Sequence, residues 1–275
     1  MATVVALSSH VSRSAVGLRV IVAALERMGH ETVSCPTIVL SNHPRYPQCA
    51  GSAVAPEVLV EMFAALDANG LLADVDAVLT GYLPSAAHVA AAAGLISRVR
   101  ARRPEAIVVC DPVFGDDPGG LFLPESVAEA VRDRLLPLAD VVKPNRFELA
   151  YLSGRPVTTP AEAVSAARSL NRPVVLASSI PHGDRALANV VVTAGRAAYA
   201  SVGREEGVPR GTGDILGALL TGHLATGRDA FESASRAVAG AGRMIAASRG
   251  YGELQLADSA AWQASDVPAL TDIAG

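Results

Sequence analysis

The chain has 275 residues, of which 50% are hydrophobic and 18% charged, so a disordered chain, which combines low hydrophobicity with high net charge, is excluded. The 23 basic and 27 acidic residues give a net charge of −4, which argues against nucleic acid as a partner because neutralising phosphates normally requires a basic excess. No apolar stretch approaches the roughly 20 residues that a bilayer-spanning helix needs, so we expect no membrane partner.

Short apolar strands alternate with helical patterns along most of the chain. We predict strands at 3–8, 32–40, 76–80, 106–110, 140–142 and 174–177, a hairpin at 189–193 and 197–202, and helices at 15–28, 56–68, 85–102, 125–135, 146–152, 160–170, 213–226 and 229–248. Residues 41–52, rich in Pro, Asn, Ser and Gly, are expected to form a loop. This alternation is typical of a parallel sheet covered on both faces, so we predict one α/β domain over 1–275 with an antiparallel edge.

Cysteine and lysine usage excludes several kinds of site. The three cysteines, Cys35, Cys49 and Cys110, are odd in number and form no CxxC pair, so neither a disulfide framework nor a four-ligand zinc site is expected. We interpret all three as buried thiols in a reducing compartment and expect a cytoplasmic protein. The only lysine is Lys143 and no Gly-Lys pair occurs, which excludes a P-loop.

Polar residues follow the predicted strands, where ligands bind in open parallel sheets. Asp111 and Asp116 follow one strand; they either supply the oxygen ligands that Mg²⁺ prefers or belong to an ordinary Asp-rich turn. Asn145 and Glu148 lie three residues apart at a helix start. They either cap that helix or bind a ligand from one face of it.

The segment Arg210-Gly211-Thr212-Gly213-Asp214 lies directly before a long helical pattern. Two glycines let backbone N–H groups turn toward an anion, and a helix N-terminus adds partial positive charge, so we predict an anion site here. Two interpretations of Asp214 are open. It is either a residue that caps the helix or compensates its dipole, or a base that accepts a proton from a hydroxyl attacking phosphorus.

Three motifs in a fixed order carry a family resemblance. Asp111 to Asp116 after one strand, Pro144 to Glu148 after the next and Gly211 to Asp214 before a helix resemble the ribokinase-like small-molecule kinases. Within that superfamily the chain is similar to the pyridoxal kinases through Ser9-His10, Ser41-Asn42-His43 with Tyr46, Gly81-Tyr82-Leu83 and Glu253-Leu254-Gln255-Leu256. The resemblance runs through almost the whole chain.

The resemblance implies a three-layer α/β/α fold with a mainly parallel central sheet and antiparallel edge strands. It implies ATP-dependent phosphorylation of the 5′-hydroxymethyl group of pyridoxal, and of pyridoxine and pyridoxamine, in vitamin B6 salvage. Asp214 would be the catalytic base, and the backbone of Gly211, Thr212 and Gly213 would hold the phosphoryl group. ATP and Mg²⁺ would be required, K⁺ is a further cation of the family, and a homodimer is expected.

The resemblance also implies binding residues. The vitamer would contact Ser9, His43, Pro44, Tyr82 and Asp214. ATP would be bound by Asp111, Lys143, Asn145, Glu148, Ser178 and Val202, and Asp111, Asp116 and Glu148 would hold Mg²⁺ directly or through water. Four places depart from the family pattern. Pro44 replaces the usual Thr and has neither a hydroxyl nor a backbone N–H, Lys143 stands where Thr or Ile is common, residues 11–14 replace a Tyr-Gly-rich stretch, and Pro209-Arg210 replaces an aromatic entry to the glycine turn. Lys143 either contacts an ATP phosphate or is a solvated strand end.

Three other functions compete with this hypothesis. A hydroxymethylpyrimidine kinase of the same superfamily would commonly carry Cys where this chain has Asp214, and would lack the Ser41-Asn42-His43 motif. A non-catalytic module that binds the vitamer or the nucleotide is suggested by Pro44 and opposed by Asp214. A nicotinamide dehydrogenase is excluded because no glycine fingerprint follows the first strand.

Overall fold

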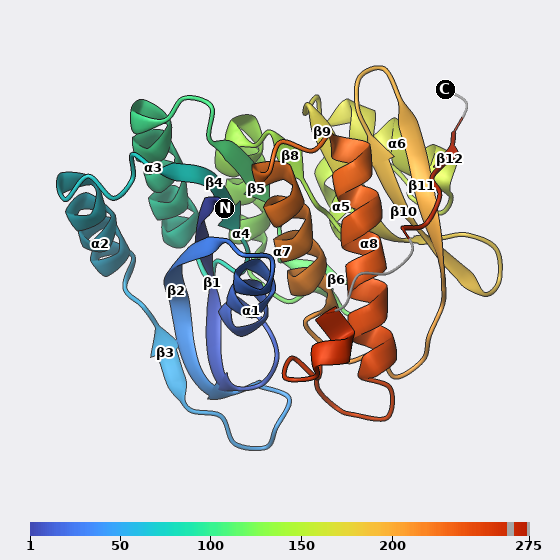
Figure 1. The fold of residues 1–275 in the computed structure, drawn as a ribbon, viewed down its shortest axis with the longest axis horizontal. Helices are drawn as coiled ribbons and strands as arrows, with labels where there is room; N and C mark the ends of the chain where they lie inside the picture. The colour runs from blue at the N-terminus through green and yellow to red at the C-terminus, as the bar shows by residue number, and fades with distance from the viewer. Residues whose placement is uncertain (263–266, 274–275) are drawn as a thin grey trace.

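The computed structural model describes residues 1–262 and 267–273, and a ten-stranded sheet lies at its centre (Figure 1). Its strands are β1 (Thr3–Arg13), β2 (Glu31–Asn42), β3 (Gly51–Ala53), β4 (Val75–Thr80), β5 (Ile107–Cys110), β8 (Val141–Val142), β9 (Val174–Pro181), β10 (Ala186–Val192), β11 (Ala197–Gly203) and β12 (Thr271–Asp272). Their order is β12-β11-β10-β9-β8-β5-β4-β1-β2-β3. The strands from β9 to β2 in this order run parallel, while β10, β11 and β12 at one edge and β3 at the other are antiparallel. The predicted fold class is confirmed.

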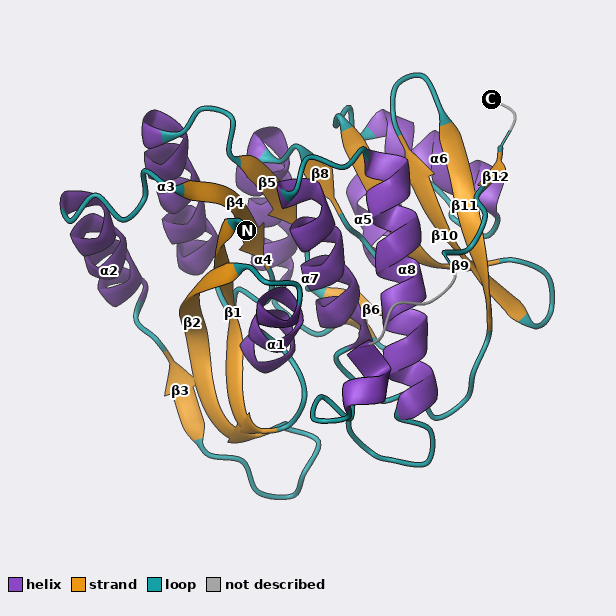
Figure 2. Cartoon of the chain, in the orientation of Figure 1, coloured by secondary structure: helices purple, strands orange, loops and turns teal. Residues whose placement is uncertain are grey.

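Helices cover both faces of this sheet. They are α1 (Leu18–Arg27), α2 (Pro56–Ala68), α3 (Ala86–Arg102), α4 (Glu125–Ala130), α5 (Arg146–Ser153), α6 (Pro160–Ser169), α7 (Thr212–Ala225) and α8 (Ala230–Ala247). Helices α1, α7 and α8 pack on one face, in front of the sheet in Figure 2, and the remaining helices pack on the other. A two-stranded sheet of β6 (Gly115–Asp116) and β7 (Gly120–Leu121) lies apart from the main sheet.

Local chemistry fixes where several helices begin. Pro56 begins α2, where its missing N–H costs nothing. The side chain of Ser85 caps α3 by accepting a bond from the His88 N–H, and Asp229 caps α8 in the same way. The predicted bounds of α2 are confirmed, and those of α3 and α8 agree to within one residue at each end because the predictions included the capping residues.

Strands β1 and β2 are longer than predicted. The prediction ended β1 at residue 8, which is wrong, and placed a loop at 41–52, of which residues 43–50 form a loop while β2 and β3 take its two ends. Strand β4 pairs with β1 only as far as Leu7, whereas β2 pairs with it up to the match of Arg13 with Asn42, and β3 then adds to β2. The strands beyond Leu7 form a projecting arm, visible at the lower left of Figure 1. The polar residues of this arm are typical of a loop. They form strands because backbone pairing between β1 and β2, without burial on both faces, keeps them extended.

The interpretation of the cysteines is partly wrong. Cys35 and Cys110 are buried, and burial raises the pKa of Cys35 to about 11 and that of Cys110 to about 12. Cys49 is exposed because it lies in the turn between β2 and β3, which has no core to cover it.

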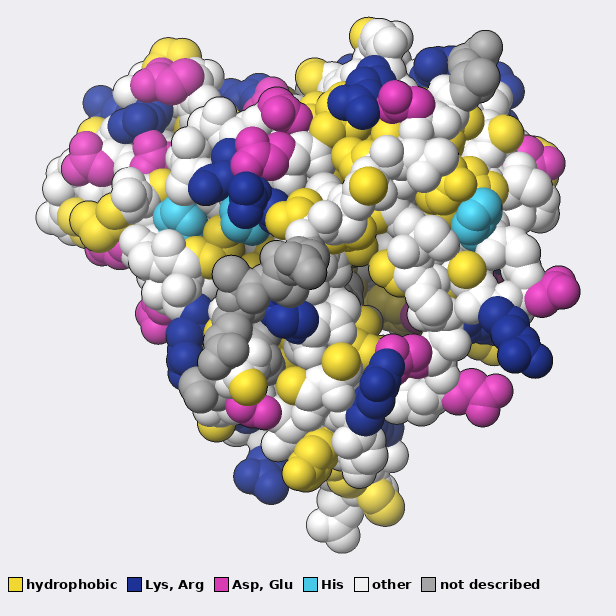
Figure 3. Space-filling view, turned by 45° about the vertical axis from the view of Figure 1, so that its right-hand side comes forward, with side chains coloured by type: hydrophobic (Ala, Val, Ile, Leu, Met, Phe, Trp, Pro, Cys, Tyr) yellow, Lys and Arg dark blue, Asp and Glu magenta, His cyan; other side chains and the backbone are white. Residues whose placement is uncertain are grey.

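The surface carries charges of both signs. Figure 3 shows basic and acidic side chains interspersed over the face that it displays. Within the described part of the chain, no helix combines the length and the apolar character needed to cross a bilayer.

Candidate active site

A cavity of about 500 Å³ opens at the carboxyl ends of β5 and β8, beside the first turn of α7. It brings together most of the predicted nucleotide, metal and catalytic residues: Asp111, Asp116, Lys143, Asn145, Glu148, Ser178, Val202, Thr212, Gly213 and Asp214. The described residues that line it do not include the predicted Ser9, His43, Pro44, Tyr82 and Gly211. The predicted nucleotide and metal residues therefore share this cavity, whereas most of the predicted vitamer residues lie outside its lining.

Asp214 lies at the tip of α7 and is held by a distant segment. Its Oδ2 accepts a hydrogen bond of 2.9 Å from the N–H of Gly17, and no side chain caps α7, so the capping interpretation is wrong. Gly17 adopts a φ of 57°, and a Cβ there would stand 2.2 Å from the carbonyl oxygen of Ser9, so only glycine fits. Burial raises the pKa of Asp214, although the Gly17 bond and the charge of Lys143 oppose the shift.

Lys143 and Asp111 form a buried ion pair inside the cavity. The Lys143 Nζ lies 3.0 Å from Oδ2 of Asp111, and the two side chains are 3% and 8% exposed. Burial acts to lower the pKa of Lys143, but the charges of Asp111 and Glu148 raise it above its usual value. Burial also raises the pKa of Asp111 to about 6, against the effect of Lys143. Lys143 is therefore a buried ammonium, and its interpretation as a solvated strand end is wrong.

The ammonium of Lys143 also lies close to the predicted anion site. Its Nζ is 3.8 Å from the position that a Cβ on Gly213 would take. A positive charge and the N-terminus of α7 thus adjoin the same part of the cavity, and both favour a bound anion.

Asn145 and Glu148 form a capping box at the start of α5. The Asn145 side chain accepts from the Glu148 N–H, and Glu148 Oε2 accepts from the Asn145 N–H at 3.0 Å. The second oxygen, Oε1, accepts from the N–H of Phe114 at 3.0 Å, so the two motifs are joined. Burial and the charge of Asp111 raise the pKa of Glu148 to about 8. The helix-capping interpretation is confirmed, and both residues still line the cavity.

The acidic residues fit Mg²⁺ through water better than by direct contact. Over residues 1–262 and 267–273, no three His, Cys, Asp or Glu side chains form a group that could hold a metal ion. Asp111 is paired with Lys143, both oxygens of Glu148 accept backbone N–H groups, and Asp116 Oδ1 accepts from Asp117. Mg²⁺ keeps several waters and commonly takes only one or two carboxylates beside substrate phosphates, which suits Asp111 and Asp116.

K⁺ fits this cavity less well. Its buried carboxylates are Asp111, which already has a monovalent cation in Lys143, and Glu148, whose oxygens are bonded to the backbone. Among the described residues, the two fully buried carboxylates of the cavity thus already have partners, and the half-buried Asp214 accepts from the Gly17 N–H.

The predicted vitamer residues lie at both ends of the arm, with Ser9 and Tyr82 near its start and His43 and Pro44 beyond the end of β2. Ser9 lies against Gly17, since its Oγ is 2.3 Å from where a Cβ on Gly17 would stand, and so adjoins the residue that holds Asp214. The Tyr82 backbone is held at both ends: its N–H donates to Ser8 Oγ and its carbonyl accepts from Thr37. His43 is half-buried and Pro44 is exposed in the turn beyond β2.

The sequence did not reveal the apolar part of the cavity. It is formed by Leu187 of β10, Val208 and, from α8, Val238, Ala241, Gly242 and Ile245. The helical pattern of α8 was recognised, but an Ala-rich helix does not indicate which of its faces meets a ligand. Val113 and Ser179, at φ values of 46° and 61°, also line the cavity, and no sequence signal marks such strained residues.

Comparisons with known proteins agree with this geometry. Residues 22–256 match the family model described as phosphomethylpyrimidine kinase. The chain is 37% identical over 262 residues to the pyridoxine/pyridoxal/pyridoxamine kinase of Bordetella bronchiseptica, covering 92% of this chain and 93% of that protein. The chain belongs to the pyridoxal kinase family. As a member, it is a phosphotransferase that acts on an alcohol group.

Solved structures of pyridoxal kinases have the same fold. The pyridoxal kinase of Leishmania donovani in complex with ADP and pyridoxamine superposes with a TM-score of 0.93 at 29% identity, over 100% of both chains. A putative phosphomethylpyrimidine kinase of Bacteroides thetaiotaomicron superposes with a TM-score of 0.89 at 25% identity, over 99% of this chain and 98% of that chain. The fold is thus shared by kinases with different names.

Proposed function

We propose that this kinase transfers the γ-phosphoryl group of ATP to the 5′-hydroxymethyl group of pyridoxal, and also accepts pyridoxine and pyridoxamine. The observation that carries the proposal is the position of Asp214. Its carboxylate lies at the N-terminus of α7, in one cavity with the Lys143 ammonium, and is aimed by the Gly17 N–H. A base beside an anion site is the arrangement that phosphoryl transfer to an alcohol requires.

In the proposed reaction, Asp214 accepts the proton of the vitamer hydroxyl while its oxygen attacks the γ-phosphorus of ATP. The new O–P bond forms as the bond from phosphorus to the β,γ-bridging oxygen breaks, and ADP leaves. Backbone N–H groups at Thr212 and Gly213 and the Lys143 ammonium stabilise the charge on the transferring group. Mg²⁺ held beside Asp111 and Asp116 would neutralise phosphate charge when bound.

The apolar part of the cavity suits the base of the nucleotide. Leu187, Val238 and Ile245 offer a surface for a flat ring, and Asn189 offers polar groups to its edge. Ser178 and Asn145, which form a parallel bridge with each other, offer further polar groups in the lining, to which phosphates could bind. We therefore propose that ATP spans the cavity with its base toward α8.

Phosphorylation of a pyrimidine, with hydroxymethylpyrimidine as the alcohol, is the second candidate, because the matching family model is described as phosphomethylpyrimidine kinase. Consumption of ATP with pyridoxal, pyridoxine, pyridoxamine and hydroxymethylpyrimidine, each with Mg²⁺, tests both candidates. We expect kcat/KM to be highest for a B6 vitamer. Turnover of the pyrimidine alone would replace the first candidate with the second, and binding of a vitamer and ATP without turnover would support a non-catalytic module.

Three further expectations belong to this proposal: one domain over 1–275, a cytoplasmic location and a homodimer. Each stays a prediction. Sedimentation analysis of the purified chain tests the last of them, since a monomer and a dimer of 28.2 kDa chains separate clearly.

A further inference from the structure

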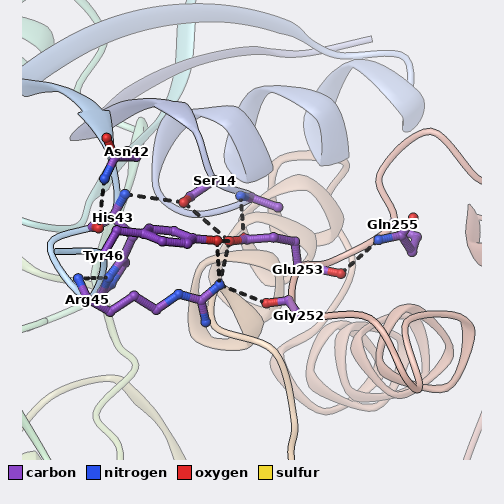
Figure 4. A network of polar contacts seen from close by, with 9 residues as sticks. Ser14, Asn42, His43, Arg45, Tyr46, Gly252, Glu253 and Gln255 are labelled. Atoms are coloured by element: carbon purple, nitrogen blue, oxygen red, sulfur yellow. Dashed lines mark hydrogen bonds and ion pairs between the residues drawn. The ribbon is translucent and has the colours of Figure 1, made fainter. Parts of the chain in front are cut away.

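A network of polar contacts centred on Glu253 lies outside the nucleotide cavity (Figure 4). The Glu253 carboxylate accepts from the N–H of Ala15 at 3.0 Å and from the hydroxyl of Ser14 at 3.3 Å. It also accepts from the Arg45 guanidinium at 2.6 Å and from the Tyr46 hydroxyl at 3.5 Å. One carboxylate thus joins the segment that follows β1 to the segment that follows β2.

The first of these segments reaches the catalytic base. The carbonyl oxygen of Ala15 lies 2.2 Å from where a Cβ on Gly211 would stand, so this segment packs on the start of α7. Two residues later, the Gly17 N–H holds Asp214. Glu253 therefore fixes one end of the segment 14–17, and Asp214 binds its other end.

The second segment is the turn that carries His43. The His43 N–H donates to Ser14 Oγ at 3.3 Å, and the Arg45 N–H donates to His43 Nδ1 at 3.1 Å. Arg45 also donates to the carbonyl of Gly252 at 3.1 Å. The position of this turn is thus tied to Glu253 through Arg45 and through Ser14.

Glu253 itself is anchored on the far side. The N–H of Gln255 donates to the buried Ser248 Oγ at the end of α8, and Leu254 is buried in the core. The backbone that carries Glu253 is therefore held in place. The side chains of Arg45 and Glu253 are 33% and 28% exposed, so salt screens their ion pair.

We infer that Glu253 is a positioning residue that couples the turn at 43–46 to the placement of Asp214. This inference rests on the proposed function, since it assumes that the vitamer binds between the arm and the tip of α7. Glu253 has two separable roles in this inference. Its ion pair with Arg45 holds the turn over the vitamer, and its bonds to Ser14 and Ala15 hold the segment that orients the base.

Three variants distinguish these two roles of Glu253 in steady-state kinetics. Arg45→Gln should raise KM for pyridoxal about threefold to fivefold, as expected for an exposed ion pair, with kcat and KM for ATP nearly unchanged. Glu253→Gln keeps an oxygen for the Ala15 N–H and should behave like Arg45→Gln. Glu253→Ala should in addition lower kcat about tenfold or more, because the base is then misplaced. Arg196→Gln, which breaks the exposed pair with Asp272 at 2.8 Å, is the matched control and should change none of these.

Hydrogen exchange without any substrate tests the coupling apart from the reaction. Glu253→Ala should speed exchange in 14–17 and 43–50 about tenfold, whereas Arg45→Gln should speed it only in 43–50. The inference is overturned if Glu253→Ala leaves kcat within twofold and exchange in 14–17 unchanged, or if KM for ATP rises as much as KM for pyridoxal. If the native chain phosphorylates neither vitamer nor pyrimidine, the proposed function fails, and the exchange data still decide the coupling.

Discussion

The two sides of the site are held together in different ways. At the nucleotide side, Lys143 and Asp111 form an ion pair with side chains only 3% and 8% exposed, and the bonds of Glu148 are buried with it. At the arm, the corresponding ion pair joins Arg45 to Glu253 with side chains 33% and 28% exposed. Removing one partner of a buried pair is strongly destabilising because it leaves an uncompensated buried charge, whereas removing one partner of an exposed pair costs little. The cavity is thus the fixed side of the site, and the arm is its exposed side.

The largest effect is expected for Asp214→Asn on the fixed side. Asn keeps an oxygen for the Gly17 N–H but accepts no proton, so kcat should fall by roughly 10²- to 10⁴-fold. ATP affinity, measured by calorimetry on the same variant, should stay nearly unchanged. A kcat within tenfold of the native value would remove Asp214 from the mechanism.

Lys143→Met tests how strongly the fixed side depends on its ion pair. Loss of the ammonium leaves Asp111 as an uncompensated buried charge, so the free energy of unfolding should fall by about 3–5 kcal/mol in urea titrations. Lys143→Met combined with Asp111→Leu should recover most of this loss, since both charges are then gone. The exposed control Arg196→Gln should change stability by less than about 1 kcal/mol. A similarly small loss in the free energy of unfolding for Lys143→Met would mean that this ion pair does not stabilise the cavity side of the site.

The pH dependence of kcat tests whether Asp214 must be deprotonated for the reaction. Burial raises the pKa of Asp214 above its usual 3.8, and only the deprotonated form accepts a proton. Below that raised pKa, kcat should fall about tenfold per pH unit, so the acid limb should lie above pH 3.8. The residual rate of Asp214→Asn, measured with the same substrate, should lack this limb. An identical limb in both proteins would assign it to another group.

The smallest effect is expected for removal of K⁺. Since the Lys143 ammonium already supplies a monovalent positive charge beside Asp111, replacing K⁺ with tetramethylammonium should change kcat by less than about twofold. Mg²⁺ is kept constant in this comparison. A tenfold loss would show that K⁺ acts elsewhere in the protein.

Much of the fold was readable because its signals are local. Pro56 and the Asn69-Gly70 pair delimit α2, and its predicted bounds are those of the structure. Strand β1 was cut short because pairing with a strand distant in sequence, rather than apolar character, keeps its polar end extended. Strands such as β3 and β12 have only two or three residues, too few for a periodic pattern.

The site was predictable where a motif combines several constraints. The grouping of Asp111 and Lys143 in one cavity follows from strand ends that meet at one edge of the sheet, and the N-terminus of α7 brings Asp214 to the same cavity. The partners of these residues were not predictable, because Gly17 and Glu253 act through the approach of segments nearly 200 residues or more apart in the chain. Contacts between such distant residues produce no regular spacing in the sequence, so no motif indicates them.

The single lysine has a chemical consequence for a protein that would make pyridoxal 5′-phosphate. That product carries an aldehyde, which condenses with unprotonated primary amines to form imines. Lys143 is buried and ion-paired, and the surface is rich in arginine, whose guanidinium is a poor nucleophile. The chain therefore offers such an aldehyde no lysine side chain on its surface, and its one lysine is held as an ammonium by Asp111.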